Sequence, residues 1–76
     1  MKPTIEHMDV IGIIGKRIKY LRITQGYTSA EIFAYDHELD KSSYCSMEKG
    51  RNMTIVSLLR LCDIHHITIK EFFEGI

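Results

Sequence analysis

The stretch LDKSSYCSMEKGR, residues 39–51, decides the fold of this chain. Asp40 can cap a helix, because its carboxylate accepts hydrogen bonds from the free N–H groups of the first turn. Gly50 can end the same helix, since glycine adopts the left-handed backbone conformation without steric cost. The sequence therefore predicts a short helix over residues 40–49. Three apolar residues mark its inward side: Leu39, Tyr44 and Met47.

The opposite side of this predicted helix is polar and carries no bulky side chain. Its members follow the helical spacing i, i+3, i+4 and i+7, and they are Ser42, Cys45, Ser46 and Lys49. A face of this kind can lie close against a flat-walled polar surface. The major groove of DNA is one such surface.

Length and composition predict one small globular domain. The chain has 76 residues, of which 45% are hydrophobic and 26% charged, so a single domain is expected and intrinsic disorder is not. The sequence shows neither an apolar run long enough to span a bilayer nor a signal-peptide pattern. Its two cysteines, with no other covalent staple, favour a reduced, cytoplasmic compartment. Residues 1–9 are expected to form a flexible lead-in to a domain over residues 10–76.

The charges balance to a formal net charge of zero, with ten basic and ten acidic residues. Nucleic-acid-binding proteins usually carry a basic excess, so the total argues mildly against such a partner. The positions of the charged residues weaken this argument. Residues 16–22 include four basic residues and no acid, and residues 41–51 include three basic residues and one acid, Glu48. The sequence thus allows a basic face on a neutral protein, with modest non-specific affinity for DNA.

A local signature that opens helices recurs four times along the chain. Each instance has a capping residue, an apolar residue just before it and another apolar residue four positions after it, which is the hydrophobic staple. The capping residues are Thr28, Asp40, Thr54 and Thr68. They predict helices over 28–37, 40–49, 54–65 and 68–74, after a first helix that ends near Gln25. Because no segment alternates with a period of two, the chain is expected to be all-α with five helices.

Other local features refine this prediction. Thr28 and Thr68 are each followed three residues later by a glutamate, which predicts two capping boxes. Only residues 38–39 separate the second and third helices, and so short a connection holds two helices at a steep angle, as in a helix-turn-helix. In the first helix, Gly12 and Gly15 each lower stability by about 1 kcal/mol relative to alanine.

The order of these features resembles the Cro/repressor-like, or XRE-type, helix-turn-helix family. The matching segments run from residue 14 to residue 73 and are IGKRIKYLR (14–22), GYT (26–28), FA (33–34), LDKSSYCSMEKG (39–50) and SLLRLCDIHHITIKEFF (57–73). The resemblance implies a five-helix lambda-repressor-like domain whose third helix reads base edges in the major groove. It also implies an ion pair between Arg22 and Glu48, which would tie the first helix to the end of the third.

Two departures from the family pattern affect the second helix. The segment between Gly26 and the FA pair is one residue longer than in the common pattern, and Ser29 or Ala30 replaces the usual glutamine of the first turn. Glu38 stands where the family has a turn glycine. A carboxylate at that position would repel a closely approaching DNA backbone.

The predicted DNA contacts form two groups. Base contacts are expected from the third helix, through Lys41, Ser42, Ser43, Cys45 and Ser46, because lysine donates to guanine, serine serves several bases and a small apolar group can touch a thymine methyl. Phosphate contacts, which position the protein without specifying sequence, are expected from Lys49, Arg51 and Asn52 and, by the resemblance, from Ser29. The alternative is a set of ordinary surface residues, with Lys49 balancing the helix dipole.

Metal binding and catalysis are not expected. Cys62, His65 and His66 have the spacing of metal ligands, and Cys45 or His37 could join them. A structural zinc site normally needs four well-spaced ligands, so core packing by the cysteine is the favoured interpretation, and no metal or cofactor is predicted. The sequence has no catalytic triad order, phosphate-binding glycine loop or paired acids that would indicate an enzyme.

Apolar residues crowd the C-terminal end, and they are Phe72, Phe73 and Ile76. Adjacent aromatic residues cannot face the same way, so one should complete the core and the surplus should form a two-fold dimer contact; a second core contact with Val10 or Ile13 is the alternative. The sequence thus predicts a homodimeric transcriptional regulator, more readily a repressor, that binds double-stranded DNA. The competing hypothesis is a protein-interaction module of the same fold that docks through this end.

Overall fold

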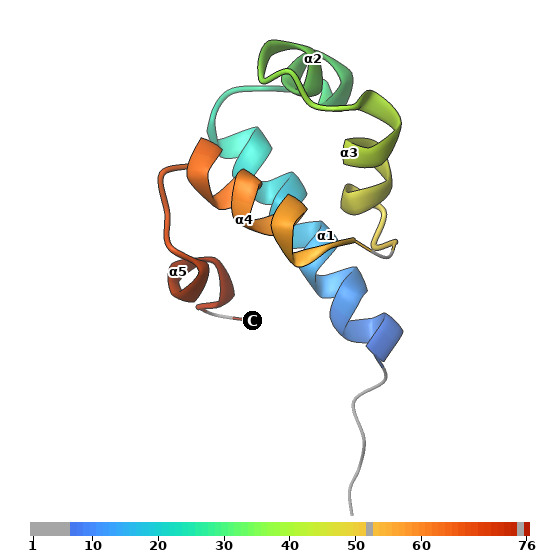
Figure 1. The fold of residues 1–76 in the computed structure, drawn as a ribbon, viewed down its shortest axis with the longest axis vertical. Coiled ribbons are helices and arrows are strands. Elements are labelled where there is room, and N and C mark those ends of the chain that lie inside the picture. Colours follow the sequence, from blue (N-terminus) through green and yellow to red (C-terminus); the bar gives the residue numbers. More distant parts are fainter. Residues whose placement is uncertain (1–6, 52, 75) are drawn as a thin grey trace, which may run out of the picture.

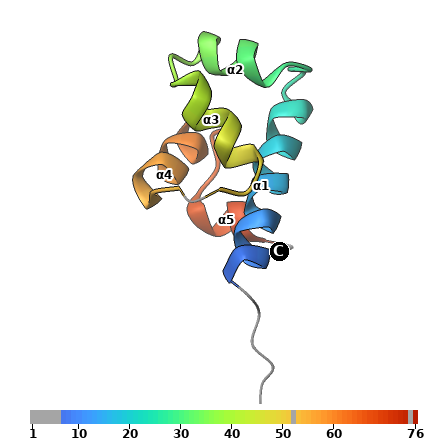
Figure 2. The same ribbon diagram turned by 90° about the vertical axis from the view of Figure 1, so that its right-hand side faces the viewer.

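The computed structural model describes residues 7–51, 53–74 and 76, and these form five helices and no strand. The helices are α1 (His7–Thr24), α2 (Ala30–Asp36), α3 (Lys41–Glu48), α4 (Ile55–Ile64) and α5 (Ile69–Phe73). The predicted all-α class is confirmed. In Figures 1 and 2, α1 is the long helix, α2 closes one end of the domain, and α3 and α5 lie on either side of α4.

The start of α1 lies three residues before the expected domain start, because the helix begins at His7. Residues 7–9, expected as part of the lead-in, are therefore helical, and residues 1–6 lie outside the described part of the chain. None of the helices in the described ranges is both long enough and apolar enough to cross a membrane.

Three of the four predicted helix caps are confirmed. Asp40 accepts a hydrogen bond from the backbone N–H of Ser43 at 2.9 Å and caps α3. Thr54 caps α4 in the same way. Thr68 caps α5 and forms the predicted capping box with Glu71. Each of these caps needs only residues within one helical turn, which explains why the sequence alone predicts them.

The prediction for the start of α2 is wrong by one residue. Its cap is Ser29 rather than Thr28, and the Ser29 hydroxyl accepts from the N–H of Ile32 at 3.2 Å. The backbone of Ser29 is extended, and Arg22 holds the carbonyl of Tyr27, two residues earlier, at 2.9 Å. The helix then starts one residue later than predicted, so the box with Thr28 does not form and Ile32 is 57% exposed rather than packed in a staple.

Glu38 closes the tight turn between α2 and α3 with a left-handed backbone, at φ 57°. It stands where the resemblance implies a glycine, and it adopts the glycine-like conformation at a cost of about 1–2 kcal/mol. The turn is held on both sides, since the N–H of Leu39 donates to the carbonyl of Ala34 at 2.8 Å and Arg60 donates to the carbonyl of Glu38 at 3.4 Å. The helix-turn-helix therefore forms without a glycine.

Every helix contributes to one buried core. Its buried members are Ile18, Phe33, Ala34, Tyr44, Met47, Leu58, Leu61, Cys62 and Phe72. The small residue at position 34 lies where α2 meets α3, and it lets the two helices approach closely.

Phe72 belongs to this core, which corrects its assignment to a dimer contact. Its side chain has no exposed surface, so it cannot touch a second chain. Arg17 donates to the backbone carbonyl of Phe72 at 3.1 Å and so ties α5 to α1. The neighbouring Phe73 is 39% exposed and Ile76 is 47% exposed, so these two stay available at the surface.

The cysteine and histidines near the end of α4 point in different directions. Cys62 is buried in the core with a free thiol. His65 stacks on Phe33 with ring centroids 5.4 Å apart, and its Nδ1 lies 2.8 Å from the amide nitrogen of Gln25. Burial lowers the pKa of the His65 imidazole, and the nearby His37 and His66 act in the same direction. Within the described residues no group of three metal-ligating side chains comes together.

Candidate DNA-binding interface

An open groove runs along the outward side of α3 and brings most of the predicted base-reading residues together. It is lined by Glu31 of α2 and by Lys41, Ser42, Cys45, Ser46 and Lys49. Lys41 and Ser42 are exposed in the first turn of α3, whereas Cys45 and Ser46 are half-buried. The walls carry short polar groups and two cations, which suits close contact with the polar edges of bases.

A second open groove lies on the other side of the same helix, between α3 and the start of α4. Its lining consists of Ser42, Ser43, Ser46, Met47, Arg51, Met53, Thr54 and Ser57. Ser42 and Ser46 line both grooves, so they form the ridge of α3 between them. Arg51 is the one cation among the residues that line the second groove. Asn52, also predicted as a phosphate contact, lies outside the described residues.

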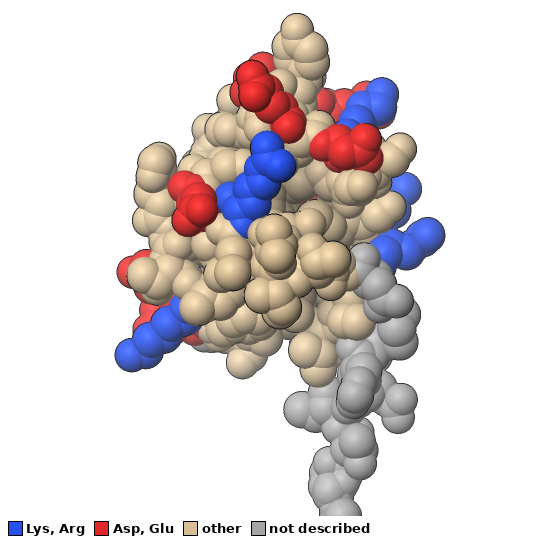
Figure 3. Space-filling model, in the orientation of Figure 1, with Lys and Arg blue, Asp and Glu red and all other residues tan. Residues whose placement is uncertain are grey.

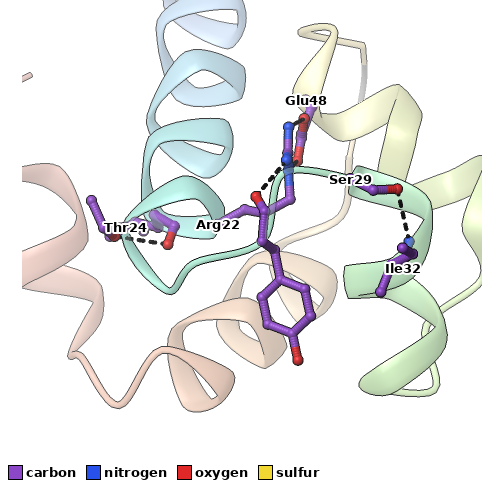
Figure 4. Close-up of polar contacts among 7 residues, drawn as sticks. Arg22, Thr24, Ser29, Ile32 and Glu48 are labelled. Carbon is purple, nitrogen blue, oxygen red and sulfur yellow. Dashed lines mark hydrogen bonds and ion pairs between the residues drawn. The ribbon is translucent and has the colours of Figure 1, made fainter.

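Ser29 lies at the start of α2, apart from these grooves, with its hydroxyl oxygen occupied as the helix cap (Figure 4). The hydroxyl proton is not used in that contact, because the oxygen accepts there, and it can still be donated to a phosphate.

The end of α3 is anchored to α1 by the ion pair that the resemblance implies. Arg22 binds Glu48 through two hydrogen bonds, Nε to Oε2 at 2.7 Å and Nη2 to Oε1 at 3.1 Å, and its Nη1 also donates to the carbonyl of Tyr27 (Figure 4). Arg22 is only 4% exposed. The hydrogen bond and the charge of Glu48 raise the pKa of the Arg22 guanidinium.

A close backbone approach holds the same end of α3 against α1. A Cβ atom placed on Gly15 would lie 2.8 Å from three backbone atoms, the carbonyl oxygens of Met47 and Glu48 and the nitrogen of Gly50. Gly50 has φ 77°, and a Cβ there would lie 2.8 Å from the Cα of Gly12. These glycines allow direct contact between α1 and the last turn of α3, which makes the helix a rigid support for its outward side chains.

The exposed charges around α3 are of both signs, as they are in the chain as a whole. Lys41, Lys49 and Arg51 are all exposed, whereas the charge of Glu48 is offset by the buried Arg22. Figure 3 shows acidic as well as basic side chains at the margin where α3 lies in Figure 1. Glu31 and Asp40 adjoin Lys41, so the cations of this surface stand among acids, and modest non-specific affinity for DNA is expected.

Glu31 is a residue of the first groove that the sequence analysis did not assign to the site. Its Oε2 lies 3.6 Å from Nζ of Lys41, and both side chains are largely exposed. From the sequence, Glu31 was expected in a capping box that does not form. Only the crossing of α2 over the start of α3 places it beside Lys41, and no short-range pattern in the sequence contains that information.

Comparisons with known proteins complete the description. No family model matches the chain, and no solved structure matches it either. The chain is similar to a curated protein described as Control protein C.MunI, from Mycoplasma sp., with 36% identity over 63 residues that cover 82% of this chain and 85% of the relative. Because this similarity spans most of both chains and the five helices form a helix-turn-helix domain, the chain belongs to the XRE-type helix-turn-helix family of sequence-specific DNA-binding transcriptional regulators.

Proposed function

We propose that the chain represses transcription as a homodimer that places α3 of each subunit in the major groove of an inverted-repeat operator. The observation that carries this proposal is the pair of open grooves on either side of α3, with Ser42 and Ser46 on the ridge between them. A ridge of small polar side chains on a rigidly anchored helix can enter the major groove, which admits an α-helix.

Within this proposal, Lys41, Ser42 and Ser46 contact base edges, and Ser43 and Cys45 flank them. Lys41 suits guanine O6 or N7, and the serine hydroxyls can donate or accept. Phosphate contacts are assigned to Lys49 and Arg51 beside this ridge, to Ser29 at the start of α2, and to Asn52. The relative is named as a control protein, and we extend a controlling role to this chain, acting on DNA in the cytoplasm. Its two free thiols suit that reducing compartment.

Selection from randomised duplex DNA at near-physiological salt tests the proposal. The expected result is enrichment of an inverted repeat whose half-sites lie about one helical turn apart. Binding to the enriched site should weaken steeply as salt rises, because cations bound to phosphates return to solution on binding. A folded protein that enriches no sequence would contradict the proposal and favour a role in binding another protein.

Removing single base contacts should weaken binding without changing the fold. Lys41→Ala and Ser46→Ala are each expected to cost about 1–3 kcal/mol on the enriched site, because each removes one contact to a base edge. Titration of fluorescent operator DNA measures the loss. Lys70→Ala on α5 is the matched control, since it removes the same exposed charge outside the grooves. Unchanged affinity in both α3 variants would show that α3 does not read the bases.

The dimer is proposed to form through exposed apolar residues of α4 and α5. On α4 these follow helical spacing, and the set from α4, α5 and the C-terminal residue is Ile55, Val56, Leu59, Ile69, Phe73 and Ile76. Exposed apolar side chains that gather on neighbouring helices favour an interaction site. A 76-residue domain buries only about 60% of the surface of its unfolded chain, so it gains from covering such a face. A two-fold contact would present two copies of α3 to an inverted repeat.

A charge placed on this face should give monomers. Val56 is 76% exposed in the first turn of α4, where an acidic side chain suits the helix dipole. Val56→Asp should therefore stay folded by circular dichroism, yet sediment as a monomer at concentrations where the wild type is a dimer. Tyr35→Asp on α2, also exposed, is the control and should remain dimeric. A Val56→Asp protein with the mass of a dimer would show that the face is not the interface.

A further inference from the structure

The ion pair between Glu31 and Lys41 is a feature of the base-reading groove that the proposed contacts do not explain. Its two charged atoms lie 3.6 Å apart, and both side chains project from the wall of the groove with most of their surface exposed. An exposed pair of this kind contributes little to folding. A substitution in this pair that changes DNA binding should therefore leave the stability of the fold nearly unchanged.

A carboxylate in this position is unfavourable for binding DNA unless a base compensates for it. Glu31 is the one acid among the six residues that line the groove, and on DNA it would approach phosphates of the same sign. The donors that a carboxylate can meet in the major groove are the amino groups of cytosine and adenine. Binding with this groove should therefore favour sequences that offer such a donor next to Glu31.

The spacing of the pair matches the exposed edge of a single base pair. The amino donor of one base and the carbonyl acceptor of its partner are joined by a hydrogen bond of about 2.9 Å. A carboxylate and an ammonium 3.6 Å apart can meet those two groups together. Glu31 would accept from the amino group while Lys41 donates to the carbonyl oxygen.

The atoms beside the amino group then distinguish cytosine from adenine. Adenine presents its N7 acceptor beside the amino group, and that lone pair repels a carboxylate; cytosine presents no acceptor there. Guanine, the partner of cytosine, offers O6 and N7 to a lysine, whereas thymine offers O4 beside a methyl group. We propose that Glu31 and Lys41 together read one C·G base pair in each half-site.

This inference rests on the proposed function and is tested by comparing the selected sites of two proteins. Glu31→Gln keeps the shape of the side chain but turns one oxygen into a donor, and an amide pairs with adenine N6 and N7. The wild type should prefer C·G at one position of the half-site. In Glu31→Gln that preference should fall by about fivefold or more and move towards A·T, with the other positions unchanged.

Glu74→Gln, which removes an exposed acid at the end of α5, is the control for the change in net charge and should select the wild-type site. Selection of the same half-site by wild type and Glu31→Gln would overturn the inference while leaving the proposed function in place. Loss of preference at every position would also overturn it, because it would assign Glu31 a structural role. A wild type that enriches no sequence would overturn both the inference and the proposed function.

Discussion

Glu48→Ala is expected to destabilise the domain by about 3–5 kcal/mol, because it leaves a buried guanidinium without its counter-charge. Arg22 is 4% exposed and loses both hydrogen bonds from its Nε and Nη2 atoms, keeping only the carbonyl of Tyr27. In a domain of this size, 1 kcal/mol lowers the melting temperature by about 4–8 °C. A drop of about 12 °C or more should therefore be seen by thermal unfolding, and DNA binding should fall only as the protein unfolds.

Glu31→Ala is the matched control for this prediction, since it removes the same side chain from a second ion pair. That pair is exposed to solvent, so its loss should change the free energy of unfolding by less than about 1 kcal/mol. Replacing both Arg22 and Glu48 by leucine should recover part of the stability, because neither charge is then stranded. A Glu48→Ala protein that melts within a degree or two of the wild type would show that the pair does not anchor α3.

Gly15→Ala is expected to destabilise the domain by about 2–3 kcal/mol, although alanine is the better helix former. The added Cβ would lie 2.8 Å from three backbone atoms at the end of α3. Backbone cannot rotate away as a flexible side chain can, so α1 and α3 must separate and lose contacts across their whole interface. Urea unfolding measures the loss, and the anchoring of α3 should weaken with it.

Gly12→Ala, in the same helix, is expected to have the opposite effect on stability. A Cβ at Gly12 meets no atom within 4 Å, so the substitution should raise stability by about 1 kcal/mol through helix propensity alone. The two variants make the same chemical change three residues apart, and their effects should differ in sign. Equal shifts of the urea midpoint in one direction would contradict the close approach at Gly15.

The sequence alone is enough to predict the starts of three helices and the inward side of α3. Asp40, Thr54 and Thr68 each cap with groups three residues away, and Tyr44 and Met47 are buried as their spacing predicts. These interactions involve neighbours along the chain, so their energies can be judged without knowing the fold. The outward face of α3 follows from the same periodicity.

Other features depend on contacts between distant segments. Thr28 and Ser29 can both cap a helix, and the structure selects Ser29, with the carbonyl of Tyr27 held by an arginine of α1. Phe72 and Phe73 are equal candidates for the core, and the docking of α5 on α1 through Arg17 leaves only the first of them buried. In both cases adjacent residues have nearly the same local energy, so the tertiary contact decides between them.

The sequence by itself determined that this protein is a small all-α helix-turn-helix domain whose third helix has a polar outward face, because capping, periodicity and turn length are local properties. Only the tertiary structure decided that Gly15 lies against the backbone of α3 and that Glu31 stands beside Lys41. Both depend on how closely and at what angle two helices cross. That geometry is determined by the packing of the whole core, to which every helix contributes.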